Sequence, residues 1–151
     1  MNITLAAIFP RRSRTKSGPT DKLQDDYLAR TSHFTPCDSQ LFDTETAFLQ
    51  WLDRQTARTP AHLILLDSRG KQLSSEELAE TIGQLRDSGT QRLVFAIGPA
   101  DGWSDASRAR ANLLLSFGRI TLPHQLARVV LAEQVYRAFT ILAGHPYHSG
   151  H

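Results

Sequence analysis

Four runs of almost exclusively apolar residues, with Thr4 and Ser116 as the exceptions, lie along the chain at residues 3–9, 63–66, 93–97 and 113–117. An unbroken apolar run is typical of a strand that is buried on both faces, as in a parallel sheet. A shorter, mixed segment at residues 39–42 predicts one further brief strand. These five segments are the expected strands of the fold.

Helical patterns fill the intervals between these strands. Residues 21–30 predict a short helix, Asp43 or Thr44 can cap a second, and residues 105–112 are compatible with a third. Ser74 and Glu77 form a capping box at the start of another helix. Strands that alternate with helices predict an α/β fold, with a parallel-rich sheet and helices on both of its faces.

The last predicted helix is the longest, and it begins near Thr121 with Pro123 and His124 in its first turn. Six residues fall on one side of it at helical spacing: Val129, Val130, Glu133, Tyr136, Arg137 and Thr140. Because two of these are charged and one is a tyrosine, we expect part of this face not to be ordinary core. Pairing with Glu133 is the favoured role for Arg137.

Length and composition describe an ordinary globular chain. At 151 residues, of which 40% are hydrophobic, it is most simply one domain, 1–151. The apolar start is too short to span a bilayer, and the basic residues follow it rather than precede it, so we expect no membrane segment and a cytoplasmic location. Cys37 is the single cysteine and the histidines lack ligand spacing, so no metal site is predicted.

Four basic residues crowd together after the first strand: Arg11, Arg12, Arg14 and Lys16. One interpretation is a flexible arm that reaches RNA phosphates through salt-sensitive contacts. The other is a solvated loop, and both remain open because no aromatic residues are interleaved. The net charge of +2 permits RNA binding without arguing for it.

Three loops follow the carboxyl ends of predicted strands, at residues 67–71, 98–103 and 117–122. Ligands of open parallel sheets bind beyond these ends. The last two loops carry glycines but match neither a dinucleotide fingerprint nor a P-loop. Backbone groups there could read the edge of an adenine, or the glycines could simply form turns.

Several motifs resemble successive blocks of the RlmH family, whose members methylate a pseudouridine of large-subunit ribosomal RNA. The blocks are LLDSRGKQLSSEELA at 65–79, FAIGPADG at 95–102, LSFGRITLPHQLARVVLAEQVYRAFTI at 115–141 and PYH at 146–148. The match covers roughly the last ninety residues. RlmH proteins are SPOUT methyltransferases, so the resemblance implies a C-terminal trefoil knot, an exception to the rule against knotted chains.

The same resemblance implies S-adenosylmethionine as cofactor and a homodimer with the long helix at the subunit contact and an RNA site shared between subunits. It makes Tyr147 and His148 the catalytic candidates: Tyr147 would position the target base, and His148 would aid proton removal or hydrogen-bond the base. The family's cofactor positions correspond to Leu66, Gly98, Phe117, Gly118, Arg119, Ile120, Thr121 and Leu122.

Arg128 joins the basic arm as a candidate for RNA phosphate; it could also meet a cofactor carboxylate or pair with Glu133 on the long helix. Two departures from the family pattern affect the expected site. Pro99 stands where a second glycine is usual and removes an amide donor. Ser149 follows His148 where a basic residue is usual.

The expected function is therefore methyl transfer from S-adenosylmethionine to ring nitrogen three of a pseudouridine in 23S ribosomal RNA. One alternative is a ribosome-associated RNA-binding protein of the same fold without turnover. The other is a SPOUT methyltransferase with a different RNA target.

Overall fold

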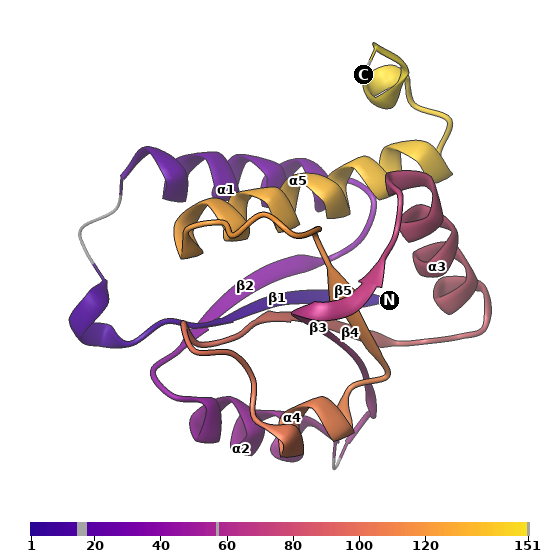
Figure 1. The fold of residues 1–151 in the computed structure, drawn as a ribbon. Coiled ribbons are helices and arrows are strands. Elements are labelled where there is room, and N and C mark those ends of the chain that lie inside the picture. The colour runs from indigo at the N-terminus through magenta and orange to yellow at the C-terminus, as the bar shows by residue number, and fades with distance from the viewer. Residues whose placement is uncertain (15–17, 57, 151) are drawn as a thin grey trace.

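A computed structural model describes residues 1–14, 18–56 and 58–150 of the chain (Figure 1). Its centre is one five-stranded sheet in the order β2-β1-β4-β3-β5. Every neighbouring pair of strands in this sheet is parallel. The strands are β1 Asn2–Ile8, β2 Cys37–Phe42, β3 Ala61–Gln72, β4 Arg92–Ile97 and β5 Leu113–Ser116.

Helices cover both faces of the sheet, which confirms the predicted α/β architecture. Helices α1 Pro19–Thr31, α3 Ser75–Asp87 and α5 His124–Leu142 lie on one face, and α2 Glu45–Thr56 and α4 Asp105–Arg110 lie on the other (Figure 1). Two short 3₁₀ helices complete the described elements, η1 Arg11–Ser13 and η2 Pro146–Gly150. The trefoil knot stays a prediction.

An apolar cluster fills each side of the sheet, and this explains the unbroken apolar runs. In β4, Leu93 and Phe95 belong to the cluster under α3 and α5, whereas Val94 and Ala96 belong to the cluster under α2. Successive strand residues point to opposite faces, so a strand covered on both sides needs apolar residues at every position. Replacing the fully buried Phe95 by alanine would cost about 3–5 kcal/mol.

The strand β3 is longer than its apolar run, and here the prediction of a turn at residues 68–71 is wrong. The chain continues as a strand, and its pairing with β5 shifts register between Leu66 and Lys71. The shift brings Gly70 against β5, where a Cβ would lie 2.5 Å from the carbonyl carbon of Leu114. Only glycine fits this close approach. The polar and charged residues at 68–71 had indicated a turn, but here they belong to a strand.

The helix α5 begins three residues later than predicted, at His124 rather than near Thr121. Pro123 is its N-cap residue, with an extended ψ of 146°. Proline disfavours the helical conformation of the residue before it, which explains why Leu122 lies outside the helix. The segment between β5 and α5 is consequently a loop, and it contains six of the residues expected to bind cofactor.

The predicted capping box at the start of α3 is confirmed. Ser74 Oγ accepts a hydrogen bond from the Glu77 amide at 3.0 Å, and the Ser74 amide donates to Glu77 Oε1 at 2.9 Å. Thr44 rather than Asp43 caps α2, because Thr44 Oγ1 accepts from the Ala47 amide at 3.0 Å. Such caps satisfy helix amides that have no partner within the helix.

Candidate functional site

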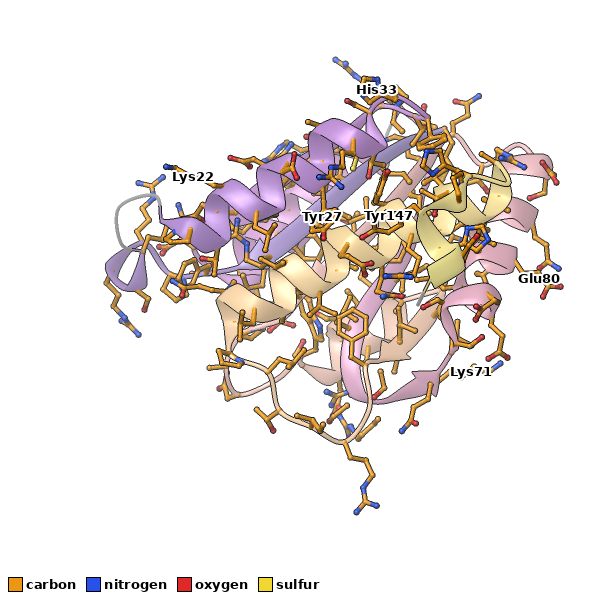
Figure 2. The ribbon with its side chains drawn as sticks, turned by 90° about the horizontal axis from the view of Figure 1, so that it is seen from above. Lys22, Tyr27, His33, Lys71, Glu80 and Tyr147 are labelled. Carbon is orange, nitrogen blue, oxygen red and sulfur yellow. The ribbon has the colours of Figure 1, made fainter. Side chains whose placement is uncertain are left out.

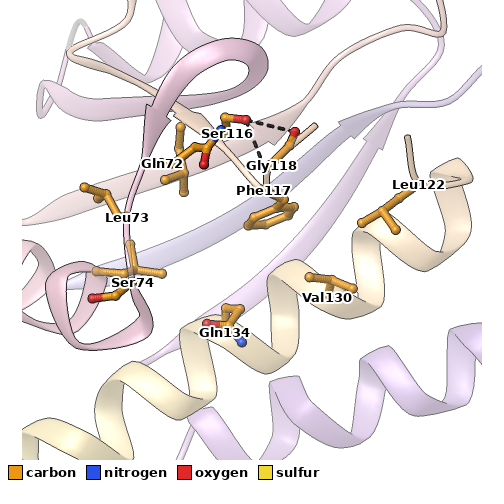
Figure 3. Close-up of a pocket in the computed structure, with 11 residues that line it drawn as sticks. Gln72, Leu73, Ser74, Ser116, Phe117, Gly118, Leu122, Val130 and Gln134 are labelled. Carbon is orange, nitrogen blue, oxygen red and sulfur yellow. Dashed lines mark hydrogen bonds between the residues drawn. The ribbon is translucent and has the colours of Figure 1, made fainter. Parts of the chain in front are cut away.

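Two adjoining cavities lie on either side of the loop between β5 and α5, at residues 117–123. The larger cavity, of about 920 Å³, is bounded by the carboxyl ends of β1, β3 and β4 and includes Phe9, Leu66 and Gly98. The smaller cavity, of about 310 Å³, lies between that loop, the end of β3 and α5 (Figure 3). Leu122 lines both cavities. Volumes of roughly 300–1,000 Å³ are typical of small-molecule sites.

Most of the residues expected to bind cofactor meet at these cavities. Leu66, Gly98, Thr121 and Leu122 line the larger cavity. Phe117 and Gly118, together with Leu122, line the smaller one (Figure 3). The two exceptions are Arg119 and Ile120, which line neither, and the Ile120 side chain is 81% exposed.

The loop also offers backbone groups to a ligand. Gly118 adopts a φ of +111°, a conformation that glycine takes at little cost. Its amide donates to Ser116 Oγ at 3.0 Å, which fixes the start of the loop. Within the described residues, the amides and carbonyls of residues 119–121 make no hydrogen bond to protein. Of these three residues, Thr121 lines the larger cavity, and its unpaired amide and carbonyl fit the edge of a purine.

A tight turn after β4 brings Trp103 back against the carboxyl ends of the strands. The Gly102 amide donates to the Pro99 carbonyl at 2.9 Å, and Gly102 takes a φ of +89°. Trp103 is then 4% exposed, and its indole N–H donates to the Leu66 carbonyl at 3.0 Å. A Cβ on Gly98 would lie 2.8 Å from the same ring.

Several charged side chains line the larger cavity, and most of them are paired. Asp67 Oδ2 lies 3.6 Å from Arg108 NH1, and Asp67 Oδ1 lies 3.7 Å from Arg69 Nε. Arg108 also pairs with Asp105. Arg12 is exposed at this cavity and forms no ion pair with the described residues. Arg12 is therefore a cation that can meet an anionic ligand.

His124 lines the larger cavity as a neutral, packed ring. It stacks on Phe9 with ring centres 4.5 Å apart. Burial lowers the pKa of His124, and the charge of Arg128 acts in the same direction, while the Ile8 backbone opposes them. Both ring nitrogens are buried. This geometry suits a structural residue rather than a base.

The two catalytic candidates lie in η2, which folds back on α5. The Tyr147 ring packs edge-on against Tyr136 with centres 4.7 Å apart, and Figure 2 shows Tyr147 and Tyr27 over the α1 and α5 side of the molecule. Burial raises the pKa of Tyr147 well above its usual range, and Tyr27 and Glu133 act in the same direction. Tyr147 is thus a hydrogen-bond donor at neutral pH. Neither Tyr147 nor His148 lines the two cavities.

A hydrogen-bonded chain nevertheless connects this tail to the smaller cavity. Tyr147 donates to Glu133 Oε1 at 3.2 Å, and Gln134 Nε2 donates to Glu133 Oε2 at 2.7 Å. Gln134 lines the smaller cavity, where its Oε1 accepts from Ser75 Oγ at 2.6 Å (Figure 3). The same carboxylate of Glu133 pairs with Arg137, which confirms the pairing predicted for that arginine.

The residues predicted to contact RNA have unequal exposure. Arg11 is exposed like Arg12, whereas Arg14 is half-buried and donates from Nε to the Phe9 carbonyl at 2.8 Å. Lys16 lies outside the described residues.

Arg128 is the least accessible of these candidates. It is only 8% exposed, and its NH1 lies 3.5 Å from Asp21 Oδ1. Burial lowers the pKa of Arg128, although Asp21 and Asp25 oppose that shift. Little of its guanidinium is left for a phosphate.

The described part of the chain has neither a cluster of metal-ligating side chains nor a membrane-spanning helix. No group of three or more His, Cys, Asp or Glu side chains in that part of the chain is arranged to hold a metal ion. Among the described helices, none combines the length and apolar character needed to cross a bilayer.

Sequence reasoning missed two contributors to the site. The sequence places Trp103 at the end of a glycine-containing loop and gives no sign of its role. Its hydrogen bond to Leu66 depends on the turn at Gly102. Gln134 has no distinguishing sequence signal beyond its place on the long helix, where it is one residue removed from Glu133.

Comparisons with known proteins identify the relatives of this chain. The family model described as predicted SPOUT methyltransferase matches residues 1–148. The chain is 49% identical to the ribosomal RNA large subunit methyltransferase H of Koribacter versatilis, over 91% of this chain and 94% of that protein. It is 45% identical to the protein of the same name from Mesorhizobium japonicum, over 98% and 99% of the two chains.

A solved structure shares the fold at low sequence identity. The SpoU methyltransferase AviRb from Streptomyces viridochromogenes, solved with the cofactor AdoMet, matches with a TM-score of 0.50 and 12% identity. The match covers 90% of this chain and 57% of AviRb. At this identity the likeness concerns the fold alone.

Proposed function

This chain belongs to the SPOUT methyltransferase family, and from that premise we propose that it methylates large-subunit ribosomal RNA with S-adenosylmethionine as methyl donor. The proposed target atom is ring nitrogen three of a pseudouridine. The observation that carries the proposal is the meeting of Leu66, Gly98 and the 117–122 loop around two adjoining cavities. These are the positions that the sequence motifs assign to the cofactor.

The chain's own groups fit such a cofactor. The backbone amide and carbonyl of Thr121, which lines the larger cavity, are free to pair with an adenine edge. The apolar walls at Phe117 and Leu122 suit a purine ring, and Arg12 suits a carboxylate or a phosphate. When bound, S-adenosylmethionine supplies an electrophilic methyl group, and the protein's main task is then to align the receiving nitrogen.

The receiving nitrogen must lose a proton, because an imide nitrogen is mostly protonated near neutral pH. We assign proton removal, or a hydrogen bond to the base, to His148. Tyr147 stays protonated under these conditions, since burial and its neighbours raise its pKa. Its single proton is donated to Glu133, so the Tyr147 oxygen can accept a hydrogen bond that orients the base without taking the proton of the receiving nitrogen.

A homodimer reconciles the tail with the cavities. Because Tyr147 and His148 line neither cavity of their own chain, we propose that the tail of one subunit completes the RNA site of its partner. The long helix α5 would lie at the contact. Leu126 on α5 and Leu23 on α1 are 46% and 45% exposed, and such apolar side chains suit an interface core.

We assign RNA phosphates to Arg11 and Arg12, which are exposed, with Arg14, Lys16 and Arg128 as secondary candidates. The basic turn at η1 borders the larger cavity, so a phosphate held there would bring RNA to the proposed cofactor. A single domain of 1–151 and a cytoplasmic location complete the proposal.

Two measurements test this function. Calorimetry with S-adenosylmethionine should give a saturable binding signal, and mass mapping of 23S ribosomal RNA from cells that lack the gene should reveal one missing methyl group on a pseudouridine. Absence of binding at millimolar cofactor would favour an RNA-binding protein without turnover. A methyl group missing from another nucleotide would replace the target and keep the enzyme class.

A further inference from the structure

Trp103 contacts two segments that the proposed function assigns to the cofactor. Its indole N–H donates to the Leu66 carbonyl at 3.0 Å, and its ring occupies the space that a side chain on Gly98 would need. Trp103 is one of the residues that line the larger cavity, although it is only 4% exposed. One side chain thus joins the end of β3 to the loop after β4.

The surroundings of Trp103 hold it firmly. Its ring lies 5.6 Å from that of Phe48 on α2, and its carbonyl accepts a hydrogen bond from Arg108. The next residue, Ser104, donates from its amide to Glu45 Oε1 at 3.0 Å and from its hydroxyl to the same oxygen at 2.7 Å. The loop is therefore fastened to α2 immediately after the indole, which leaves the ring little freedom.

We infer that Trp103 is a positioning residue of the cofactor site, which fixes the Leu66 carbonyl and the Gly98 backbone and thereby sets the affinity of this chain for an adenosyl cofactor. The inference rests on the proposed function, because it needs the cofactor to bind at these strand ends. It concerns affinity, so the chemical step is unaffected once the cofactor is bound.

The physical reason lies in the acceptor capacity of the Leu66 carbonyl. The indole N–H takes one of the two lone pairs of this oxygen, so a rigid neighbour fixes the direction of the carbonyl at the end of β3. Preorganised groups bind more tightly because less ordering occurs on binding. Pro99 has removed one amide from this loop, so a side chain that restrains the remaining backbone matters more.

The test compares two tryptophan-to-phenylalanine variants. Trp103→Phe keeps an aromatic ring but removes the indole N–H, whereas Trp51→Phe makes the same change on α2, in the same apolar cluster but outside the larger cavity. Calorimetry with S-adenosylhomocysteine should show an affinity loss of about threefold to tenfold for W103F, the range expected for one hydrogen bond. W51F should bind like the unchanged protein.

Kinetics separate positioning from a merely structural effect. With RNA saturating, W103F should raise the KM for S-adenosylmethionine by the same factor while kcat stays within about twofold. A purely structural loss would lower the fraction of folded protein, and hence kcat, with no change in KM. Thermal melts of W103F and W51F show how much stability each substitution removes.

Fluorescence gives a second measurement that leaves Trp103 in place. The chain has two tryptophans, so Trp103 is the single tryptophan of the W51F variant. Titration of that variant with S-adenosylhomocysteine should change its emission with a midpoint equal to the calorimetric Kd. This readout holds even if W103F does not fold.

The outcomes distinguish the inference from the proposed function. A silent tryptophan in W51F, or normal affinity in W103F, would overturn the inference while cofactor binding by the unchanged protein stands. An equal affinity loss in W51F would also overturn it. If the unchanged protein binds neither S-adenosylmethionine nor S-adenosylhomocysteine, the proposed function fails and the inference fails with it.

Discussion

The Tyr147 hydroxyl donates a hydrogen bond to Glu133 Oε1 over 3.2 Å, and this contact folds the tail back onto the middle of α5. Arg137 shares the carboxylate, with its Nε 2.8 Å from the same oxygen, and its guanidinium carbon lies 5.2 Å from the centre of the Tyr147 ring. The tail is therefore held on the helix that we assign to the subunit contact. That placement motivates the first prediction.

Replacing His148 by alanine should lower the methylation rate about a hundredfold, because acid–base catalysis typically contributes 10²–10⁴-fold. The affinity for S-adenosylmethionine should stay within about twofold, since His148 lines neither cavity. Single-turnover methylation of ribosomal RNA and calorimetry measure the two effects. His33→Ala, an exposed histidine beyond α1, is the matched control and should react normally. A near-normal rate in H148A would remove His148 from the mechanism.

Replacing Arg12 by alanine should weaken RNA binding at every sequence tested and reduce the slope of log K against log salt by about one. The reason is that Arg12 is an exposed cation at the larger cavity without an ion-pair partner in the described part of the chain. Filter binding at several salt concentrations gives the slope.

The matched control for Arg12 is Arg86→Ala, which removes an exposed arginine paired with Asp87 at 3.2 Å on α3. This variant should keep both the affinity and the salt slope. Equal losses in the two variants would indicate a diffuse effect of net charge instead of a contact at η1.

Replacing Gly98 by alanine should destabilise the protein by about 1–3 kcal/mol, the usual cost of overpacking a buried site. The added Cβ would lie 2.8 Å from the Trp103 ring, which also packs against Phe48 with ring centres 5.6 Å apart. Urea denaturation measures the loss, and calorimetry with S-adenosylhomocysteine should show weaker binding.

Gly83→Ala on α3 is the control for Gly98. Its Cβ would come 2.9 Å from Leu142 Cδ2, the far end of a flexible side chain that can rotate away. Alanine is also favoured over glycine within a helix by about 1 kcal/mol, so G83A should be neutral or slightly stabilising. If G98A and G83A changed the free energy of unfolding by similar amounts, the Trp103 ring would move away from the added methyl group as easily as the Leu142 side chain does.

The stability of the protein should fall as the pH drops below about 6.5, the ordinary pKa of histidine. Burial lowers the pKa of His124 in the folded state, so the unfolded chain binds more protons between the lowered value and the ordinary one. Stability is therefore complete above the unfolded pKa and is lost as the pH falls through the folded pKa. Urea denaturation between pH 5 and 7.5 follows this window.

His124→Phe keeps a ring against Phe9 but cannot titrate, so this variant should lose most of that slope. Some slope should remain, because burial also lowers the pKa of His62. An unchanged slope in H124F would mean that His124 is protonated as readily in the folded state as in the unfolded chain.

The apolar runs predicted the strands because burial on both faces leaves little choice of residue. The run at 93–97 falls within β4, and its alternate members supply the two apolar clusters. The apolar pattern did not predict the end of β3, because Ser68, Arg69 and Lys71 are typical of a turn. The structure continues the strand through these residues, with Gly70 packed closely against Leu114. That contact joins segments far apart in the chain, which local patterns do not report.

The same distinction applies to the site. Motif resemblance assigned Leu66, Gly98 and the 117–122 loop, and the fold brings most of these residues to two cavities. The hydrogen bond from Trp103 to Leu66 spans 37 positions in sequence and depends on the turn at Gly102. Periodicity and composition describe local patterns, so they do not predict a hydrogen bond between residues this far apart in sequence.

Leu122 lines both of the cavities that adjoin the 117–123 loop. A bound molecule that displaces the Leu122 side chain would increase the volume of its own cavity and decrease the volume of the other. If molecules occupy both cavities at once, their binding is coupled through this side chain, and such a coupling is reciprocal. Under that condition, the conformation of Leu122 would set the space available to each of the two molecules.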